Sequence, residues 1–305
     1  DSEDFSGILT RGGTIIGSSR QPFKLMRVPD ENGLDKVAAM KQNYYKLRLD
    51  CVVILGGNGT QKTANLLREE GLNVIHLPKT IDNDIWGTDL TFGYQSAIDI
   101  ATTAIDQIHT TASSHGRVFI VEVMGHKVGW LTLSAGLASG ADVILLPEIP
   151  YDLDKVCEAI KKRHSRGKKF TILAVAEGAI SKEMAELKKK DRKKAMEKML
   201  EKCPSVSYKL AADITERTGS EVRVTVPGHV QRGGSPDPFD RGLYTKLGVY
   251  ASKLIIDEEY GYMVASVNNQ IVKVPLEASA GQLKMVDPDD QTVQLAKFMG
   301  ISFGD

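Results

Sequence analysis

The sequence predicts an α/β fold built on mainly parallel β-sheets, and two observations support that prediction. Short apolar runs alternate along the chain with amphipathic segments of about a dozen residues, which is typical of βαβ units. The apolar run at 51–55 also leads directly into Gly56-Gly57-Asn58-Gly59-Thr60 and then into a helical pattern that closes at Gly71. This order of strand, glycine loop and helix is typical of the ligand-binding edge of a parallel sheet.

Each element is predicted from its own pattern of apolar residues. Continuous apolar runs indicate buried strands, and they lie at 51–55, 74–77, 118–121, 143–146, 170–176 and 222–226. Apolar residues spaced three and four apart indicate helices, and these lie at 32–48, 64–70, 95–109, 131–140, 154–166, 181–202, 209–218 and 244–256. The pair Asn268-Asn269 predicts a hairpin over 262–274, whereas 276–305 carries only a weak pattern.

Composition argues against several classes of function. The 305 residues are 42% hydrophobic and 26% charged, as in an ordinary globular chain. The 39 basic residues equal the 39 acidic ones, so the net charge indicates neither a nucleic acid nor a membrane surface as partner. The lysine-rich run at 181–202 is interleaved with carboxylates, which favours a solvated amphipathic helix. Cys51, Cys157 and Cys203 lack metal-ligand spacing, which favours reduced thiols in the cytoplasm.

Two loops together indicate a phosphate site. Glycines let backbone N–H groups approach an anion, and the start of the following helix adds its positive end. Further along, Pro78-Lys79-Thr80-Ile81-Asp82-Asn83-Asp84 follows the strand predicted at 74–77. Two carboxylates at this spacing, Asp82 and Asp84, suit a base and a metal ligand. The glycine segment alone also fits a plain βα turn, but the second loop argues against that interpretation.

Several stretches, taken in order, resemble the motifs of one family. They are Gly13-Thr14-Ile15-Ile16-Gly17-Ser18-Ser19-Arg20, the two loops just described, Val121-Glu122-Val123-Met124-Gly125-His126, and Pro227-Gly228-His229-Val230-Gln231-Arg232-Gly233-Gly234-Ser235-Pro236. They resemble the phosphofructokinase family of the bacterial type, and the likeness spans nearly the whole chain. The family's first strand and its SGGDxPGxN loop are absent from the printed sequence.

The resemblance implies two Rossmann-like lobes with an active site in the cleft between them. A donor lobe would span 1–93, a fructose 6-phosphate lobe 94–245, and 246–305 would return to the donor lobe. The implied reaction moves a phosphoryl group from ATP to O1 of fructose 6-phosphate and uses Mg²⁺. The implied assembly is a homotetramer or homodimer.

The resemblance also assigns roles to individual residues. Asp82 would be the base, Thr80 would position the reacting groups, and Asn58 and Asp84 would hold Mg²⁺. The donor phosphates would contact Arg20, Gln21, Gly57, Asn58, Gly59, Thr60 and Lys79, with Arg20 also contacting the transferred group. Besides Thr80 and Asp82, the sugar phosphate would contact Met124, Gly125, His126, Glu177, His229 and Arg232. Arg117 and Arg223 would reach a substrate bound mainly by a neighbouring subunit.

The sequence departs from the family pattern at the donor site. Asn58 stands where the family usually has a carboxylate that helps bind magnesium, and His126 stands where it often has arginine. In this family, glycine at the position of Gly59 occurs in enzymes that use ATP, whereas lysine at the position of Lys79 occurs in enzymes that use pyrophosphate. ATP is therefore the expected donor, with pyrophosphate as the alternative. A lipid or NAD kinase, and a regulatory subunit that binds sugar phosphate without catalysis, are further alternatives.

Overall fold

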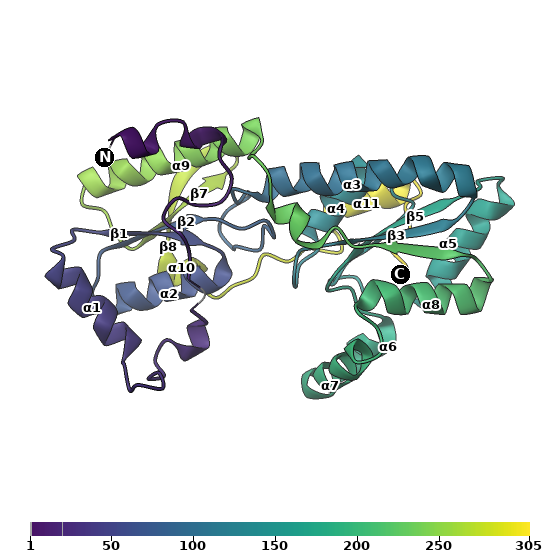
Figure 1. The fold of residues 1–305 in the computed structure, drawn as a ribbon, viewed down its shortest axis with the longest axis horizontal. Helices are drawn as coiled ribbons and strands as arrows, with labels where there is room; N and C mark the ends of the chain where they lie inside the picture. The colour runs from purple at the N-terminus through teal and green to yellow at the C-terminus, as the bar shows by residue number, and fades with distance from the viewer. Residues whose placement is uncertain (1, 20) are drawn as a thin grey trace. The chain divides into compact units, whose positions relative to one another are not determined.

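The computed structural model describes residues 2–19 and 21–305, and these form two compact units (Figure 1). The first unit comprises residues up to Ser96 together with Gly234–Lys284, and the second comprises Ala97–Gly233 and Met285–Asp305. Each unit contains its own four-stranded sheet. The predicted α/β fold with mainly parallel sheets is confirmed.

The sheet of the first unit has the strand order β1-β2-β7-β8. Its strands are β1 (Val52–Gly56), β2 (Val74–Pro78), β7 (Tyr262–Val267) and β8 (Gln270–Pro275). The first three are parallel, and β8 pairs with β7 as an antiparallel hairpin. Asn268 and Asn269, at its tip, both have positive φ, as a tight two-residue turn between twisted strands requires. The predicted hairpin is confirmed.

Helices cover both faces of this first sheet (Figure 1). On one face lie α1 (Lys36–Lys46), α2 (Asn58–Glu69) and α10 (Leu276–Ser279), and on the other lies α9 (Pro238–Ile256). Side chains of β2 alternate between the two layers, since Val74 packs with α2 whereas Ile75 and Leu77 pack with α9. Burial on both faces explains why a parallel strand is a continuous apolar run in the sequence.

The second unit has an all-parallel sheet in the order β4-β5-β3-β6. Its strands are β3 (Val118–Val123), β4 (Val143–Leu145), β5 (Thr171–Ala176) and β6 (Val222–Thr225). One face is covered by α5 (Leu153–Ser165) and α8 (Val206–Thr218). On the other face lie α3 (Tyr94–His115), α4 (Trp130–Ala138) and α11 (Gln291–Phe298) (Figure 1). Short 3₁₀ helices lie at Ser2–Phe5, Ile8–Thr10, Phe23–Leu25 and Gly228–Arg232.

The single helix predicted over 181–202 is wrong. The structure has two helices there, α6 (Lys182–Glu186) and α7 (Lys189–Leu200), with Leu187 and Lys188 extended between them. The cause is Arg192, whose guanidinium donates to the carbonyls of Met184, Ala185 and Leu187 and so closes the end of α6. None of the residues of either helix is buried, which agrees with the predicted solvated face.

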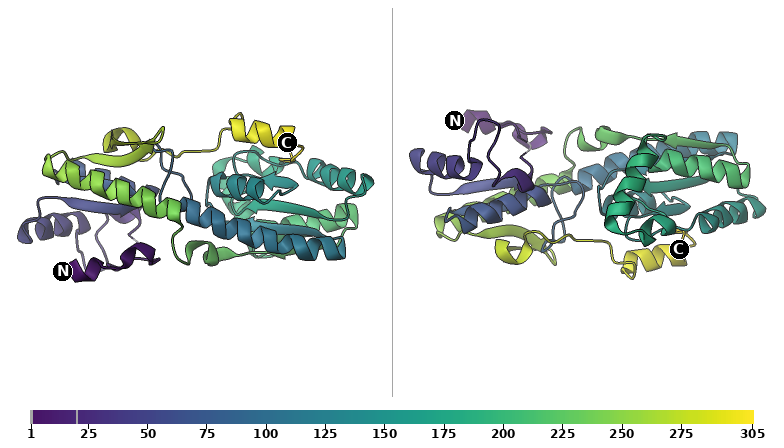
Figure 2. Two further views of the ribbon diagram at one scale, coloured as in Figure 1. Left: turned by 90° about the horizontal axis from the view of Figure 1, so that it is seen from above. Right: turned by 90° about the horizontal axis from the view of Figure 1, so that it is seen from below.

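The division into units differs from the expected lobes at the C-terminus. Residues 234–245, expected in the fructose 6-phosphate lobe, belong to the first unit together with 246–284, whereas 285–305 belong to the second unit (Figure 2). In that last segment the carbonyl of Ser302 accepts from the N–H of Ile144 (2.9 Å), and the carbonyl of Gly304 accepts from Asp152 (2.7 Å). These contacts are made by backbone groups, so no side-chain pattern revealed them. None of the described helices combines the length and apolar character needed to cross a membrane.

Candidate active site

Pairing between β1 and β2 brings the two predicted loops to the same edge of the first sheet. The register sets Gly56 opposite Pro78, and the N–H of Lys79 donates to the Gly56 carbonyl (3.1 Å). Just beyond, a Cβ placed on Gly57 would lie 3.5 Å from the Cβ of Thr80. The glycine loop and the acid-bearing loop therefore lie side by side at the carboxyl ends of neighbouring parallel strands, as predicted.

The glycine loop ends in a helix start that is open to an anion. Gly57 is the N-cap of α2 and offers no side chain, and the carbonyl of Gly57 accepts from the N–H of Gln61 (2.9 Å). The N–H groups of Asn58, Gly59 and Thr60 precede that bond and have no acceptor within the helix. The first turn carries no acidic residue. These amides and the positive helix end can bind a phosphate group.

The acid-bearing loop is held in shape by two threonines. The Thr80 hydroxyl accepts from the backbone N–H of Asp82 (3.1 Å), and the Thr91 hydroxyl donates to the Thr80 carbonyl (2.8 Å). Asp82 and Asp84 are both half-buried. Because Thr80 also lies beside Gly57, these bonds fix the backbone that carries Asp82 relative to the start of α2.

Asn83 is the internal clamp of this loop. It is buried, and its φ of 53° lies in the left-handed region, which asparagine tolerates better than most residues. Its amide nitrogen donates to the carbonyl of Asp89 (3.1 Å), and its amide oxygen accepts from the N–H of Thr91 (3.0 Å). Both polar atoms of the Asn83 side chain are thus hydrogen-bonded to backbone groups of the same loop region.

Asn58 is tied to the C-terminal part of the first unit. Its amide nitrogen donates to the carbonyl of Gln282 (2.8 Å), which leaves the amide oxygen as the group available to a cation. No cluster of three or more His, Cys, Asp or Glu side chains that could hold a metal occurs within the described ranges. A donor set of one amide oxygen and the Asp84 carboxylate fits Mg²⁺, which is usually bound by one or two protein oxygens plus substrate phosphates.

His76 lies in β2 directly beneath the glycine loop and is completely buried. Its Nε2 lies 3.1 Å from the Gly56 carbonyl, and because a carbonyl only accepts, Nε2 carries the proton. Burial lowers the pKa of His76 to about 4, although its bond to Gly56 opposes that shift. Nδ1 is buried without a hydrogen-bond partner among the described residues, so a second proton there would have no acceptor.

We therefore expect acid to destabilise the first unit through His76. The pKa of His76 is near 6.5 in the unfolded chain and about 4 in the folded one, so between these pH values the unfolded chain binds more protons. The contribution of neutral His76 to the unfolding free energy is therefore complete above pH 6.5 and falls as the pH falls. The loss at pH 5 is roughly 2 kcal/mol of unfolding free energy. Urea unfolding of the wild type and of His76→Gln, which can still donate to Gly56, should show a shallower pH dependence in the variant. Equal pH dependence would contradict this account.

In the second unit, the predicted sugar-phosphate residues after β3 and β5 come together. One oxygen of the Glu177 carboxylate accepts from the backbone N–H groups of Gly125 (3.2 Å) and His126 (2.7 Å). The amide oxygen of Gln231 accepts from the N–H of Met124 (3.2 Å). Glu177 therefore orders the loop that it was predicted to accompany, while its side chain stays exposed.

The backbone of this loop requires glycine at two positions. Gly125 has φ 145°, and a Cβ there would lie 2.6 Å from the carbonyl oxygen of Val128. A Cβ on Gly178 would lie 2.2 Å from the carbonyl oxygen of His126. The loop and the end of β5 are therefore packed backbone against backbone, which leaves little freedom in the position of His126.

Arg117 and Arg223 lie at the other end of the same sheet. Both contact the carboxylate of Glu221, with Arg117 Nε at 2.7 Å, and Arg117 is the first cause of the lowered pKa of Glu221. Arg117 precedes β3, whereas Met124 follows it, and a six-residue strand is about 20 Å long. One ligand held at Met124 within the same subunit cannot also contact Arg117.

The remaining predicted residues are less constrained. Arg20 lies outside the described residues. Gln21 is exposed and its amide nitrogen donates to Ser19 (3.3 Å), and Lys79, His229 and Arg232 are exposed as well. The 3₁₀ helix Gly228–Arg232 carries both His229 and the buried Gln231, which links that helix to Met124.

Several residues that shape these loops were missed by sequence reasoning. They are buried or half-buried polar side chains that bond backbone groups: His76, Asn83, Gln231, Glu148 and Lys284. Asn83 lies inside the Asp82–Asp84 motif, so a polar residue with a left-handed preference was a usable signal there. Gln231 also lies inside a motif, at 227–236, but nothing in that motif indicated its bond to Met124. His76, Glu148 and Lys284 lie in a strand, a turn and the weakly patterned C-terminal part, where sequence alone gave no signal.

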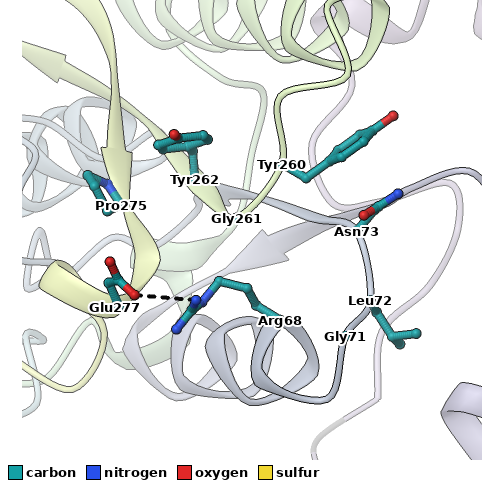
Figure 3. Close-up of a pocket in the computed structure, with 9 residues that line it drawn as sticks. All are labelled: Arg68, Gly71, Leu72, Asn73, Tyr260, Gly261, Tyr262, Pro275 and Glu277. Atoms are coloured by element: carbon teal, nitrogen blue, oxygen red, sulfur yellow. Dashed lines mark ion pairs between the residues drawn. The ribbon is translucent and has the colours of Figure 1, made fainter.

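A separate cavity of about 370 Å³ lies at the opposite edge of the first sheet (Figure 3). It is lined at the amino ends of β2 and β7 by Asn73, Tyr260 and Tyr262, and by the ion pair of Arg68 with Glu277 (3.4 Å). Ligands of open α/β sheets bind at the carboxyl ends of the strands. This cavity is therefore not the candidate active site.

Comparisons with known proteins agree with this geometry. A family model described as phosphofructokinase matches residues 1–255 and so ends before the segment around Gln282. The ATP-dependent 6-phosphofructokinase of Spirochaeta thermophila is 54% identical over 309 residues, which cover 99% of this chain and 83% of that protein. The ATP-dependent 6-phosphofructokinase 3 of Bacteroides thetaiotaomicron is 47% identical over 303 residues, covering 99% and 84% respectively.

Solved structures show the same relationship. Phosphofructokinase from Pichia pastoris in the T-state matches with a TM-score of 0.76 and 34% identity over 97% of this chain, but only 32% of that chain is covered. A pyrophosphate-dependent phosphofructokinase from Marinobacter aquaeolei, with a TM-score of 0.74 and 21% identity, supports the fold alone. The resemblance seen in the sequence is confirmed, and the chain belongs to the phosphofructokinase family.

Proposed function

We propose that this chain is an ATP-dependent 6-phosphofructokinase, which transfers the γ-phosphoryl group of ATP to O1 of fructose 6-phosphate in glycolysis. The observation that carries the proposal is that Thr80 lies beside Gly57, where a Cβ added to Gly57 would be 3.5 Å from the Thr80 Cβ. It brings an amide-lined helix start against the loop that carries Asp82. Phosphoryl transfer depends mainly on positioning and on charge stabilisation, and these two loops supply both.

The donor phosphates bind at the start of α2. The N–H groups of Asn58, Gly59 and Thr60 point out of the first turn, and the helix dipole favours negative charge there. A Cβ on Gly59 would meet no heavy atom within 4 Å, so the space beside this turn is open. Lys79 is exposed on the neighbouring loop, where its ammonium can pair with a phosphate of either donor.

Asp82 is the general base. Its carboxylate accepts the proton of the sugar O1 hydroxyl as that oxygen bonds to the γ-phosphorus, while the bond from the γ-phosphorus to the bridging oxygen breaks and ADP leaves. The bond from the Asp82 N–H to Thr80 fixes the backbone from which the carboxylate projects. Asp82 then returns the proton to solvent.

Asn58 and Asp84 would hold Mg²⁺ through their side-chain oxygens. When bound, the ion supplies positive charge that offsets the charge of the donor phosphates. The bond from Asn58 to Gln282 orients the amide so that its oxygen, not its nitrogen, is available. Asp84 is then the one carboxylate of the pair.

The sugar phosphate is bound by the second unit and by a neighbouring subunit. Met124, Gly125, His126, His229 and Arg232 form the first group, with Glu177 ordering the loop. Arg117 and Arg223, at the opposite end of the sheet, serve the site of a neighbouring copy, because they cannot reach a ligand at Met124 of their own chain. We infer a homodimer or homotetramer, as the family resemblance implies, and sedimentation analysis tests it. The free thiols of Cys51, Cys157 and Cys203 fit a cytoplasmic location.

The test of the proposal is a donor comparison. Purified protein is supplied with fructose 6-phosphate, Mg²⁺ and either ATP or pyrophosphate, and fructose 1,6-bisphosphate is measured through aldolase. We expect turnover with ATP. Turnover with pyrophosphate but not with ATP would show that pyrophosphate is the donor, which is the alternative that Lys79 favours. Binding of fructose 6-phosphate without turnover with either donor would instead favour the regulatory subunit, which Asn58 suggests.

A further inference from the structure

One short segment of the first unit, residues 282–284, contacts both loops of the donor site. At one end the carbonyl of Gln282 accepts from the Asn58 amide (2.8 Å), and at the other the N–H of Lys284 donates to the carbonyl of Asp84 (3.0 Å). Between them, Leu283 forms an antiparallel bridge with Ile85. Gln282 and Lys284 are two residues apart, so these contacts lie within about 7 Å along the chain.

The side chain of Lys284 also contacts the stretch that directly follows the acid-bearing loop. Its ammonium donates to the carbonyls of Thr88 (2.9 Å) and Asp89 (2.7 Å), and the side chain is half-buried. Together with the backbone bond to Asp84, one residue therefore holds both ends of the stretch 84–89. Hydrogen bonds from a charged donor are stronger than neutral ones.

We propose that Lys284 is a positioning residue for phosphoryl transfer. Through it, the segment 282–284 holds the Asp82–Asp84 loop and the Asn58 end of the glycine loop in one fixed arrangement. The backbone links Lys284 to Gln282, which accepts from Asn58, so Lys284 can act on the glycine loop through that short segment. The inference rests on the proposed function, since it concerns the geometry of that site.

The physical reason is the short distance between the anchored and the reacting atoms. The backbone carbonyl of Asp84 accepts from the N–H of Lys284, and Asp82 is two residues away on the same tight loop. A displacement of this loop by about 1 Å can lower the rate by as much as about 10²-fold, because transfer requires aligned reacting atoms. Nothing in this account requires Lys284 to touch substrate.

The test replaces Lys284 by methionine, which keeps the length of the side chain but removes its donors. We expect kcat to fall about 10- to 100-fold, with KM for fructose 6-phosphate within about twofold of the wild type. Lys284→Arg can still donate to two carbonyls and should recover most of kcat. The matched control is Lys273→Met, since Lys273 is in the same unit but pairs with Glu259. That control should leave kcat unchanged.

A second measurement does not depend on activity. Hydrogen exchange of the backbone amides at 84–89 should be faster in folded Lys284→Met than in the wild type and in Lys273→Met. A role confined to overall stability would lower the melting temperature and leave kcat per folded molecule unchanged. Unchanged kcat, or unchanged exchange at 84–89, would overturn the proposal.

The design separates this proposal from the proposed function. If the wild type shows no turnover with either donor, the proposed function fails and the exchange measurement still decides whether Lys284 holds the loop. If the wild type turns over and Lys284→Met turns over equally well, the positioning role fails while the proposed function stands.

Discussion

Replacing Asp82 by asparagine is expected to lower kcat by about 10²- to 10⁴-fold, the usual contribution of a positioned general base. Asparagine has nearly the same shape but cannot accept the proton of the sugar hydroxyl. The backbone N–H at this position still donates to Thr80, so the loop keeps its anchor. KM for fructose 6-phosphate and for ATP should therefore change little. Steady-state kinetics with each substrate varied in turn measures both quantities.

The matched control for Asp82→Asn is Asp99→Asn. Asp99 is exposed on α3, outside the loop, and its replacement removes the same charge. This control should retain full activity, and both variants should melt close to the wild type. If Asp82→Asn retains more than about a tenth of wild-type kcat, the base assigned here is wrong.

The sequence was sufficient to predict the strands and the main loops, for a physical reason. In a parallel sheet covered on both faces, each strand is a continuous apolar run. The strands β2, β3 and β5 can therefore be recognised directly in the sequence. Glycine segments and carboxylates that follow such runs must then lie at the carboxyl ends of the strands. The position of Gly57 beside Thr80 follows from that geometry alone.

Helix limits were predicted less well because they depend on capping contacts. The helix predicted to begin at Tyr244 begins at Pro238, where Asp237 accepts from the N–H of Asp240 and proline occupies the first turn. An aspartate-proline pair was a usable signal, and it was missed. The break near Leu187 had no such signal, because Arg192 closes α6 from the following helix.

What the sequence could not reveal is the support behind the candidate site. Lys284 contacts Thr88 and Asp89, almost 200 residues earlier in the sequence. A local sequence pattern cannot indicate a contact between residues so far apart along the chain. The same holds for Gln231 beneath Met124. For Gln231 and Lys284, the contacts that hold the motifs in place are visible only once the chain is folded.

Replacing Gly59 by aspartate is expected to lower kcat/KM for ATP by about 10²-fold or more. The substitution itself fits the fold, since a Cβ at position 59 meets no heavy atom within 4 Å and the residue is exposed. A carboxylate in the first turn of α2 even suits the helix dipole, so stability should not fall. A bound phosphate would lie about 5 Å away, and at an effective dielectric of 20 that repulsion is about 3 kcal/mol.

The decisive comparison is with Gly59→Asn, which adds nearly the same atoms without the charge. If donor phosphates lie against the start of α2, the asparagine variant keeps most of its ATP activity and the aspartate variant loses it. Pyrophosphate, assayed beside ATP, shows whether the charge also shifts the choice of donor. Equal ATP activity in the two variants would mean that the phosphates bind elsewhere, and the donor site assigned to this helix start would have to be abandoned.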